Sequence, residues 1–222
     1  MAHKISDFLN DMDLSDIGEK KIHNFSPSKR IPIFLLIDNS ASMSIIEEKM
    51  SNTVNRVINT LYKHKEVQIG ADVYLLTFND RVTILNDRSP ITKNYKLNID
   101  YHGPSFLGLA LKNVLNFIET IKSHYKQSTP AIKYYTPLLL FFSDGYTYSN
   151  SIDQELYISS ITRIKKEVSA NFLNVFSFAL GEEYDYNNLC DITGLSNSSH
   201  IIIVENGGKW FDDFENFFIL PE

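Results

Sequence analysis

Short apolar runs alternate with longer amphipathic stretches along most of this chain. Each run is bounded by polar residues, glycine or proline and has the length of a buried strand. The runs cover residues 31–37 (IPIFLLI), 73–78, 138–142, 172–180 and 201–204. Residues 31–37 are apolar throughout, which predicts a central parallel strand that is covered on both faces.

Between these runs, apolar residues recur every three or four positions, the spacing of a helix with one buried face. Helices are therefore predicted over residues 43–61, 107–121, 152–168, 186–192 and 209–218. Asn79-Asp80 predicts a hairpin into a short antiparallel strand at 81–85. The alternation predicts an α/β fold: a three-layer, doubly wound, mostly parallel, Rossmann-like sheet with one antiparallel edge strand.

The first thirty residues differ from the rest because acidic and apolar residues alternate there without a strong period. We predict a loosely attached N-terminal extension over residues 1–30, followed by one domain over 31–220. Four aspartates interrupt any apolar core of a signal peptide. The single cysteine, Cys190, cannot form an internal disulfide. Both features favour the cytoplasm.

Composition and charge exclude several classes of partner. A chain of 222 residues with 43% hydrophobic residues is typical of one globular domain. Its net charge of -6 gives no basic field that would attract nucleic acid. No apolar run reaches the roughly 18 residues that a membrane span requires. Nothing in the sequence indicates an oligomeric state.

Oxygen-bearing side chains follow two of the predicted core strands. Asp38, Ser40 and Ser42 occupy alternate positions after the first run, and Asp144 follows the run at 138–142. Ser105 lies in the loop before the helix at 107–121. Binding sites in doubly wound sheets lie at the carboxyl ends of strands, where these five side chains can meet. Oxygen is the ligand that Mg²⁺ prefers, so a magnesium site is predicted.

The charge of this set indicates what the site would accept. Two carboxylates neutralise one divalent cation, whereas a third would make the site anionic and repel an incoming acid. The hydroxyls leave the metal electrophilic, and the helix that begins near Ser42 also favours a negative group. An external carboxylate is therefore expected as the last metal ligand.

The order and spacing of these residues resemble a known site. The D-x-S-x-S sequence at 38–42, Ser105 within GPSFLG and Ser143-Asp144-Gly145 resemble the metal-ion-dependent adhesion site (MIDAS) of von Willebrand factor A domains. The resemblance covers about residues 31–220. It implies a non-enzymatic domain that docks on a protein partner, whose Asp or Glu completes the coordination of the metal.

The resemblance also implies individual roles. Asp38, Ser40, Ser42 and Ser105 would bind Mg²⁺ or Mn²⁺ directly or through water, and Asp144 mainly through water. Within the family, LLIDNSASM and LTF look like the bacterial TerY type, which is associated with tellurium resistance and stress.

This chain departs from the family's pattern at two positions in the Ser105 loop. It has Pro104 where the family commonly has Gly, and Ser105 where the family usually has Thr. Serine keeps the ligand oxygen but lacks the methyl group that restrains the rotamer. We therefore expect a lower metal affinity.

Other interpretations of the same residues stay open at this level. Ser42 or Ser44 can cap a helix without any metal. Asp38 can be the nucleophile of a Mg²⁺-dependent phosphohydrolase, although Ser40 occupies the position of that family's second Asp. A serine hydrolase would require a G-x-S-x-G elbow, which is absent, and only His102 lies near the loops of the site. A scaffold with a vestigial metal site is a further possibility.

Aromatic residues flank two of the candidate ligands. Tyr146 and Tyr148 follow Asp144, and Phe106 follows Ser105. They predict either an aromatic rim for a docking partner or ordinary loop packing. The sequence contains neither a P-loop nor a G-x-G-x-x-G motif, so a nucleotide is not implied.

Overall fold

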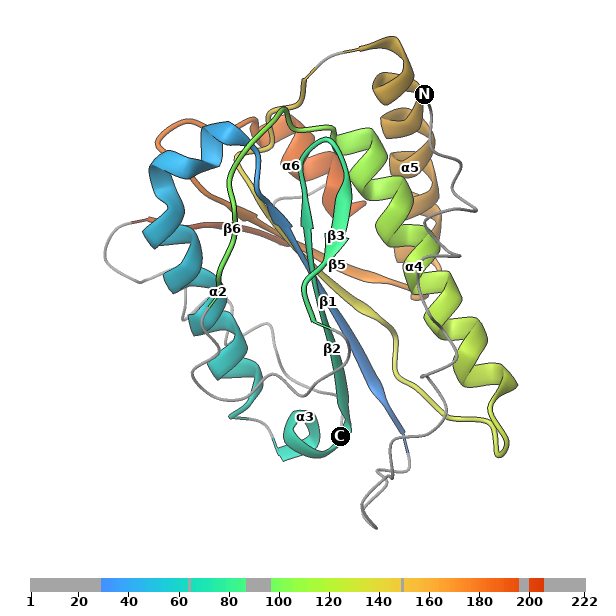
Figure 1. The fold of residues 1–222 in the computed structure, drawn as a ribbon. Helices are drawn as coiled ribbons and strands as arrows, with labels where there is room; N and C mark the ends of the chain where they lie inside the picture. The colour runs from blue at the N-terminus through green and yellow to red at the C-terminus, as the bar shows by residue number, and fades with distance from the viewer. Residues whose placement is uncertain (1–28, 64, 87–96, 149, 196–199, 206–222) are drawn as a thin grey trace.

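The computed structural model describes residues 29–63, 65–86, 97–148, 150–195 and 200–205. The predicted extension, apart from its last two residues, and the predicted aromatic helix at 209–218 lie outside this part of the chain. Figure 1 shows a twisted sheet with helices on both sides.

In the described part of the chain, six strands form one sheet in the order β3-β2-β1-β4-β5-β6. Their bounds are β1 Ile31–Asp38, β2 Ala71–Phe78, β3 Val82–Ile84, β4 Leu138–Ser143, β5 Asn174–Ala179 and β6 Ile201–Ile203. Strand β3 pairs antiparallel with β2, and every other pairing is parallel. The predicted mostly parallel sheet with one antiparallel edge strand is confirmed.

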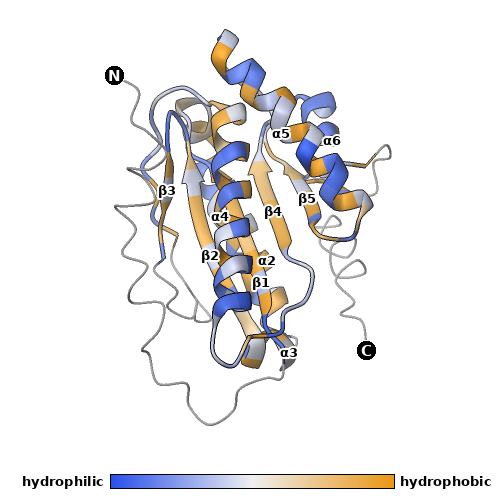
Figure 2. Ribbon diagram, turned by 90° about the vertical axis from the view of Figure 1, so that its right-hand side faces the viewer, coloured by the Kyte–Doolittle hydropathy of each residue, from blue (hydrophilic) through white to orange (hydrophobic). Residues whose placement is uncertain are grey.

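Helices cover both faces of the sheet, which gives three layers (Figure 1). The helical segments are η2 Ala41–Ile46, α2 Glu47–Leu61, α3 Lys65–Gly70, α4 Leu107–Gln127, α5 Ser151–Ser169 and α6 Tyr186–Thr193. Helix α2 contributes to the core on one face, and α4, α5 and α6 contribute to the core on the other. Figure 2 shows that the central strands are hydrophobic along most of their length, whereas α4 is hydrophobic on only part of its surface.

Strand β1 lies at the centre of the sheet, as predicted. Ile33, Leu35 and Ile37 point into the core beneath α2, while Phe34 and Leu36 point into the core beneath α4. All five side chains are fully buried, which explains why the strand is apolar at successive positions rather than at alternate ones.

Several element boundaries differ from the prediction, including the end of α4 at Gln127 and the start of β2 at Ala71. Two of the differences have clear local reasons. The helix predicted over 43–61 begins as the tight 3₁₀ turn η2, in which the Ser44 hydroxyl donates to Ala41 O. The strand predicted from residue 172 begins at Asn174. Asn171 has a positive φ of 56°, and Phe172 N–H donates to Glu167 O, so these residues still belong to the end of α5. Helix α3 was not predicted because it has only six residues.

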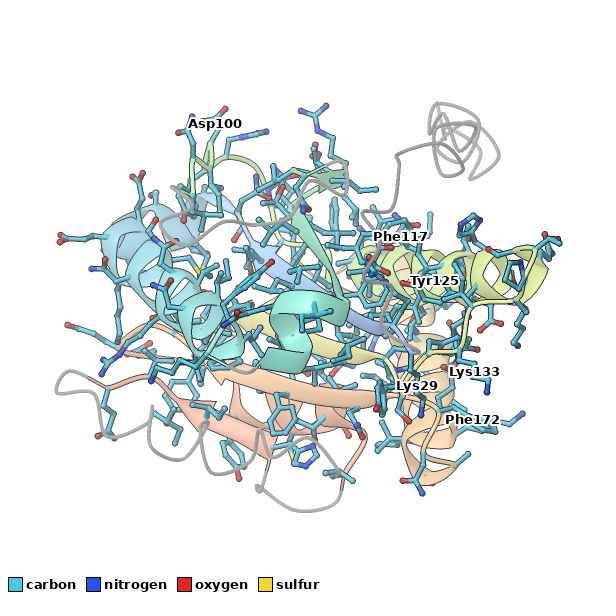
Figure 3. The ribbon with its side chains drawn as sticks, turned by 90° about the horizontal axis from the view of Figure 1, so that it is seen from below. Lys29, Asp100, Phe117, Tyr125, Lys133 and Phe172 are labelled. Carbon is cyan, nitrogen blue, oxygen red and sulfur yellow. The ribbon has the colours of Figure 1, made fainter. Side chains whose placement is uncertain are left out.

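At the amino ends of the strands, an ion pair joins Arg30, which precedes β1, to Asp72 of β2. Arg30 donates through Nε and a terminal nitrogen to the Asp72 carboxylate, and the Tyr125 hydroxyl donates to the same group. Burial raises the pKa of Tyr125, which keeps its phenol protonated as a donor. Figure 3 shows Tyr125 and Lys29 on the opposite side of the molecule from Asp100.

Replacing Asp72 with alanine should lower the free energy of unfolding by about 1–3 kcal/mol, because the buried Tyr125 hydroxyl and the half-buried Arg30 guanidinium lose their shared acceptor. Urea unfolding of Asp72→Ala measures this change, with Glu155→Ala, an exposed position on α5, as the control. A loss below about 0.5 kcal/mol, the usual range for surface substitutions, would show that water satisfies both donors equally well.

No helix in the described part of the chain is both long and apolar enough to cross a lipid bilayer.

Candidate metal centre

The parallel sheet brings the ends of β1 and β4 together at one edge. Asp38 is the last residue of β1, and Ile37 pairs with Phe142 of β4, which places Asp38 beside Ser143 and next to Asp144. The carboxyl ends of these strands lie toward the top of Figure 1, where α2 and α4 also begin. The sheet register therefore places two carboxylates from distant parts of the sequence side by side.

Hydrogen bonds connect all five predicted site residues. Ser40 N–H donates to Asp38 Oδ1 at 2.9 Å, and the hydroxyls of Ser40 and Ser42 lie 3.2 Å apart. The Ser42 hydroxyl reaches Asp144 Oδ2 at 3.4 Å. The Ser105 hydroxyl donates to Asp38 Oδ2 at 3.3 Å. The expectation that these side chains converge on one point agrees with the structure.

Four of the five site residues are buried, and Ser42 is exposed. Asp38 is 0% exposed, Ser40 2%, and both Ser105 and Asp144 8%. A cation held by these oxygens would therefore be surrounded by protein except near Ser42, where an outside ligand can approach.

Within the described residues, the two carboxylates lack a positive partner. The pKa of Asp38 is raised to about 6, mainly by burial; the nearby charge of Asp144 acts in the same direction, whereas hydrogen bonds from Ser40 and Ser143 oppose the shift. Burial also raises the pKa of Asp144. Among the described residues, neither carboxylate forms an ion pair with Lys, Arg or His. Two buried carboxylates without a counter-charge are costly unless a cation binds them.

The donor set fits a small hard cation. Adjacent ligands of an octahedral ion with ~2.1 Å bonds lie about 3.0 Å apart. The spacings of 3.2–3.4 Å between the side-chain oxygens come close to this value. The described residues contain no group of three or more His, Cys, Asp or Glu that could hold a metal. A metal centre here would consequently depend on the serine hydroxyls, as the sequence predicts.

Backbone hydrogen bonds keep the loops of the site in register. Asn39 N–H donates to Phe78 O, and Ala41 N–H donates to Gly103 O, which joins the D-x-S-x-S turn to the Ser105 loop. The Asn79 side chain donates to the carbonyl of His102 at 3.0 Å. These contacts fix the turn from two sides before any ion binds.

Sequence reasoning did not assign a role to Ser143. Its hydroxyl donates to Asp38 Oδ2 at 2.7 Å and accepts a hydrogen bond from Gly145 N–H. Ser143 is the last residue of its strand and is fully buried. The sequence offers one sign of this role, because Ser143 is a polar residue at the end of an apolar strand and next to Asp144. Only the register between β4 and β1 shows that Ser143 contacts Asp38.

Aromatic residues and His102 lie in the loops of the site. Tyr146 and Tyr148 are 48% and 61% exposed, and the ring of Tyr148 meets Phe106 edge-on at 5.8 Å. Loop packing and an exposed aromatic rim are therefore both present. The ring of His102 lies 3.5 Å from the exposed carboxylate of Asp100.

Comparison with known proteins identifies the family. The sequence matches the profile of the von Willebrand factor type A domain over residues 33–216. The chain belongs to this family. A search of curated proteins gave no match. Family membership therefore accounts for the fold of this von Willebrand factor A domain, but it does not specify the domain's role.

Solved structures with the same fold include proximal thread matrix protein 1 from the mussel byssus, at 12% identity and a TM-score of 0.60 over 86% of this chain. A further structure of that protein has a zinc-occupied MIDAS motif, with 13% identity, a TM-score of 0.56 and 83% coverage. This chain spans less than half of the mussel protein, 47% and 46% in the two structures.

Another similar structure is the manganese-loaded TRAP protein of Plasmodium vivax. The identity is 15% and the TM-score 0.54, over 78% of this chain and 68% of the TRAP chain. At such low identities, the similarity of these structures to this chain is a similarity of fold alone.

Proposed function

We propose that this von Willebrand factor A domain binds Mg²⁺ or Mn²⁺ and uses the ion to dock an acidic residue of a protein partner. Asp38, Ser40, Ser42 and Ser105 would hold the ion directly or through water, and Asp144 mainly through water. The bound metal would supply a positive, electrophilic centre for the partner's carboxylate. The role is one of binding rather than catalysis.

One observation carries the proposal: two buried carboxylates with raised pKa values share a ring of hydroxyls and lack a cationic side-chain partner within the described chain. Such a set is stabilised by a divalent cation, whose charge it neutralises. The metal-loaded MIDAS motif of the similar mussel structure supports the same interpretation.

The contacts of Asp38 do not favour the phosphohydrolase alternative. A nucleophilic carboxylate needs a free oxygen facing the substrate, whereas Asp38 is fully buried. One of its oxygens accepts from Ser40 N–H, and the other accepts from the hydroxyls of Ser105 and Ser143. Ser40 is not an acid that could protonate a leaving group.

For the biological setting we propose a cytoplasmic, TerY-like bacterial system for tellurium resistance or stress. The LLIDNSASM and LTF sequences support this narrower assignment. We further propose that residues 31–220 form the domain and that residues 1–30 are an extension of it.

Metal affinity and partner capture test the proposal together. Isothermal titration with Mg²⁺ should show one site in the wild type and binding weakened at least about tenfold in Ser42→Ala, since even outer-shell partners of a metal contribute 10- to 100-fold. Ser44→Ala is the matched control, because Ser44 lies in the same turn but its hydroxyl donates to Ala41 O rather than to a site residue. Its affinity should stay within twofold.

The same three proteins then serve as baits in a lysate of the source organism, with Mg²⁺ or with EDTA. A partner held by wild type and Ser44→Ala in Mg²⁺, but lost in EDTA and with Ser42→Ala, supports metal-dependent docking. Retention under all conditions would leave a scaffold that binds through another surface. A partner unrelated to tellurium or stress would refute the TerY-like setting alone.

A further inference from the structure

A buried carboxylate outside the proposed ligand set lies close to the Ser105 loop. Asp153, in the first turn of α5, is only 4% exposed. Its Oδ1 accepts from Leu109 N–H at 2.8 Å, and its Oδ2 accepts from Gly108 N–H at 3.2 Å. Helix α4 has no side-chain cap of its own. Asp153 therefore caps the helix that follows Ser105 from a neighbouring helix.

Thr147 connects this cap to Ser105 itself. Its hydroxyl lies 3.2 Å from Ser105 O and 3.2 Å from Asp153 Oδ2, and it accepts from Leu107 N–H at 3.3 Å. Having one proton, it donates to one of these oxygens at a time. Tyr148 N–H also donates to Ser105 O, at 2.7 Å. The carbonyl of Ser105 is thus held by Tyr148 N–H, and also by the Thr147 hydroxyl whenever that proton points to Ser105 rather than to Asp153.

Both of these donors belong to the loop that begins at Asp144. The segment that supplies one proposed ligand, Asp144, therefore also fixes the backbone of another, Ser105, which is distant from it in the sequence. This matters because Ser105 lacks the β-methyl group that would restrain its rotamer. Its hydroxyl is held by the hydrogen bond to Asp38 Oδ2, and this bond keeps its geometry only while the backbone of the Ser105 loop stays in place.

We propose that Thr147 and Asp153 are positioning residues that hold the Ser105 hydroxyl in place for the metal and couple it to the Asp144 loop. Neither residue touches the ion. Asp153 fixes the start of α4, and Thr147 transmits this constraint to the Ser105 carbonyl. The inference rests on the proposed metal-binding function.

Thr147 is the better position for a test because its side chain is exposed and its replacement leaves the core intact. Thr147→Val keeps the shape and removes the hydroxyl, and Thr147→Ser keeps the hydroxyl. Losing the hydrogen bond of this hydroxyl should weaken Mg²⁺ binding by roughly three- to tenfold. Thr147→Ser should stay within twofold of wild type.

The decisive comparison repeats Thr147→Val in a Ser105→Ala background. If Thr147 acts through Ser105, its replacement there should change the Mg²⁺ dissociation constant by less than twofold. A second readout needs no metal: the amide of Leu107 should exchange its hydrogen faster in Thr147→Val but not in Thr147→Ser.

Each outcome separates this inference from the function on which it rests. Wild-type protein that fails to bind Mg²⁺ would refute the proposed function, and the inference with it. Wild-type binding together with unchanged affinity in Thr147→Val would overturn the inference alone. An equal loss with and without the Ser105 hydroxyl would also overturn it, because the effect would then not pass through Ser105.

Discussion

Asp38→Asn is expected to abolish Mg²⁺ binding while making the metal-free domain more stable. Asparagine has the same shape and keeps an oxygen for Ser40 N–H, and its amide can donate to the oxygens of the Ser105 and Ser143 hydroxyls, because a hydroxyl can accept as well as donate. The substitution removes a negative charge that is fully buried. Loss of that charge should weaken Mg²⁺ binding by at least about 100-fold, roughly 2.7 kcal/mol.

The stability gain follows from the raised pKa of Asp38. Because the pKa of this group is about 6 in the folded state and about 3.9 when unfolded, the ionised form is costly in the fold. That cost is absent below pH about 4, grows between pH about 4 and 6, and is constant above. At pH 7 Asp38→Asn should therefore raise the free energy of unfolding by about 1–3 kcal/mol in EDTA.

Urea unfolding of both proteins in EDTA, from pH 4 to pH 7, measures this difference. The two curves should converge as the pH falls, whereas in saturating Mg²⁺ only the wild type should gain stability. Asp100→Asn is the matched control, since that carboxylate lies on the loop beside Asn39 and is 94% exposed. Mg²⁺ affinity in Asp38→Asn equal to that of the wild type would refute the proposed site.

Gly108→Ala should destabilise the domain strongly, although alanine is the better helix former. A Cβ at this position would lie 2.0 Å from the carbonyl oxygen of Asp153 and 2.6 Å from Tyr157 N. Both are backbone atoms, so α4 and α5 would have to move apart. We expect a loss of at least about 3 kcal/mol, at the upper end of overpacking effects. Helix propensity alone predicts a gain of roughly 0.5–1 kcal/mol.

Thermal unfolding should show this loss as a fall in Tm of about 6–12 °C, given 2–4 °C per kcal/mol for a chain of this size. Lys112→Ala, one turn further along α4, is the control and should change stability by less than about 0.5 kcal/mol. A stability of Gly108→Ala equal to that of the wild type would show that the two helices separate at no cost.

The hydrophobic pattern is enough to predict the strands of the sheet, but it predicts the ends of elements less well. Successive apolar residues in β1 indicate burial on both faces, because neither face of a central strand meets water. Short or irregular elements carry a weaker signal. The tight turn η2 and the end of α5 at Asn171 are decided by local hydrogen bonds, which periodicity does not record.

The five candidate ligands could be predicted because each is a polar residue at or near the end of an apolar element. Asp38, Ser40 and Ser42 follow one strand directly, and Asp144 follows another. The end of an apolar run can be located in the sequence alone, and a doubly wound sheet brings such ends together. The residues that support them are different, because Ser143, Thr147 and Asp153 act on partners up to 105 positions away.

The sequence by itself determined the fold class, the central position of β1 and the identity of the oxygens that gather at the edge of the sheet. The tertiary structure decided which carboxylate oxygen meets which hydroxyl, that Asp38 is deprived of water, and that α5 caps α4. These features depend on strand register and on the separation of two helices. Both are set by packing across the whole domain, so a local stretch of sequence cannot specify them.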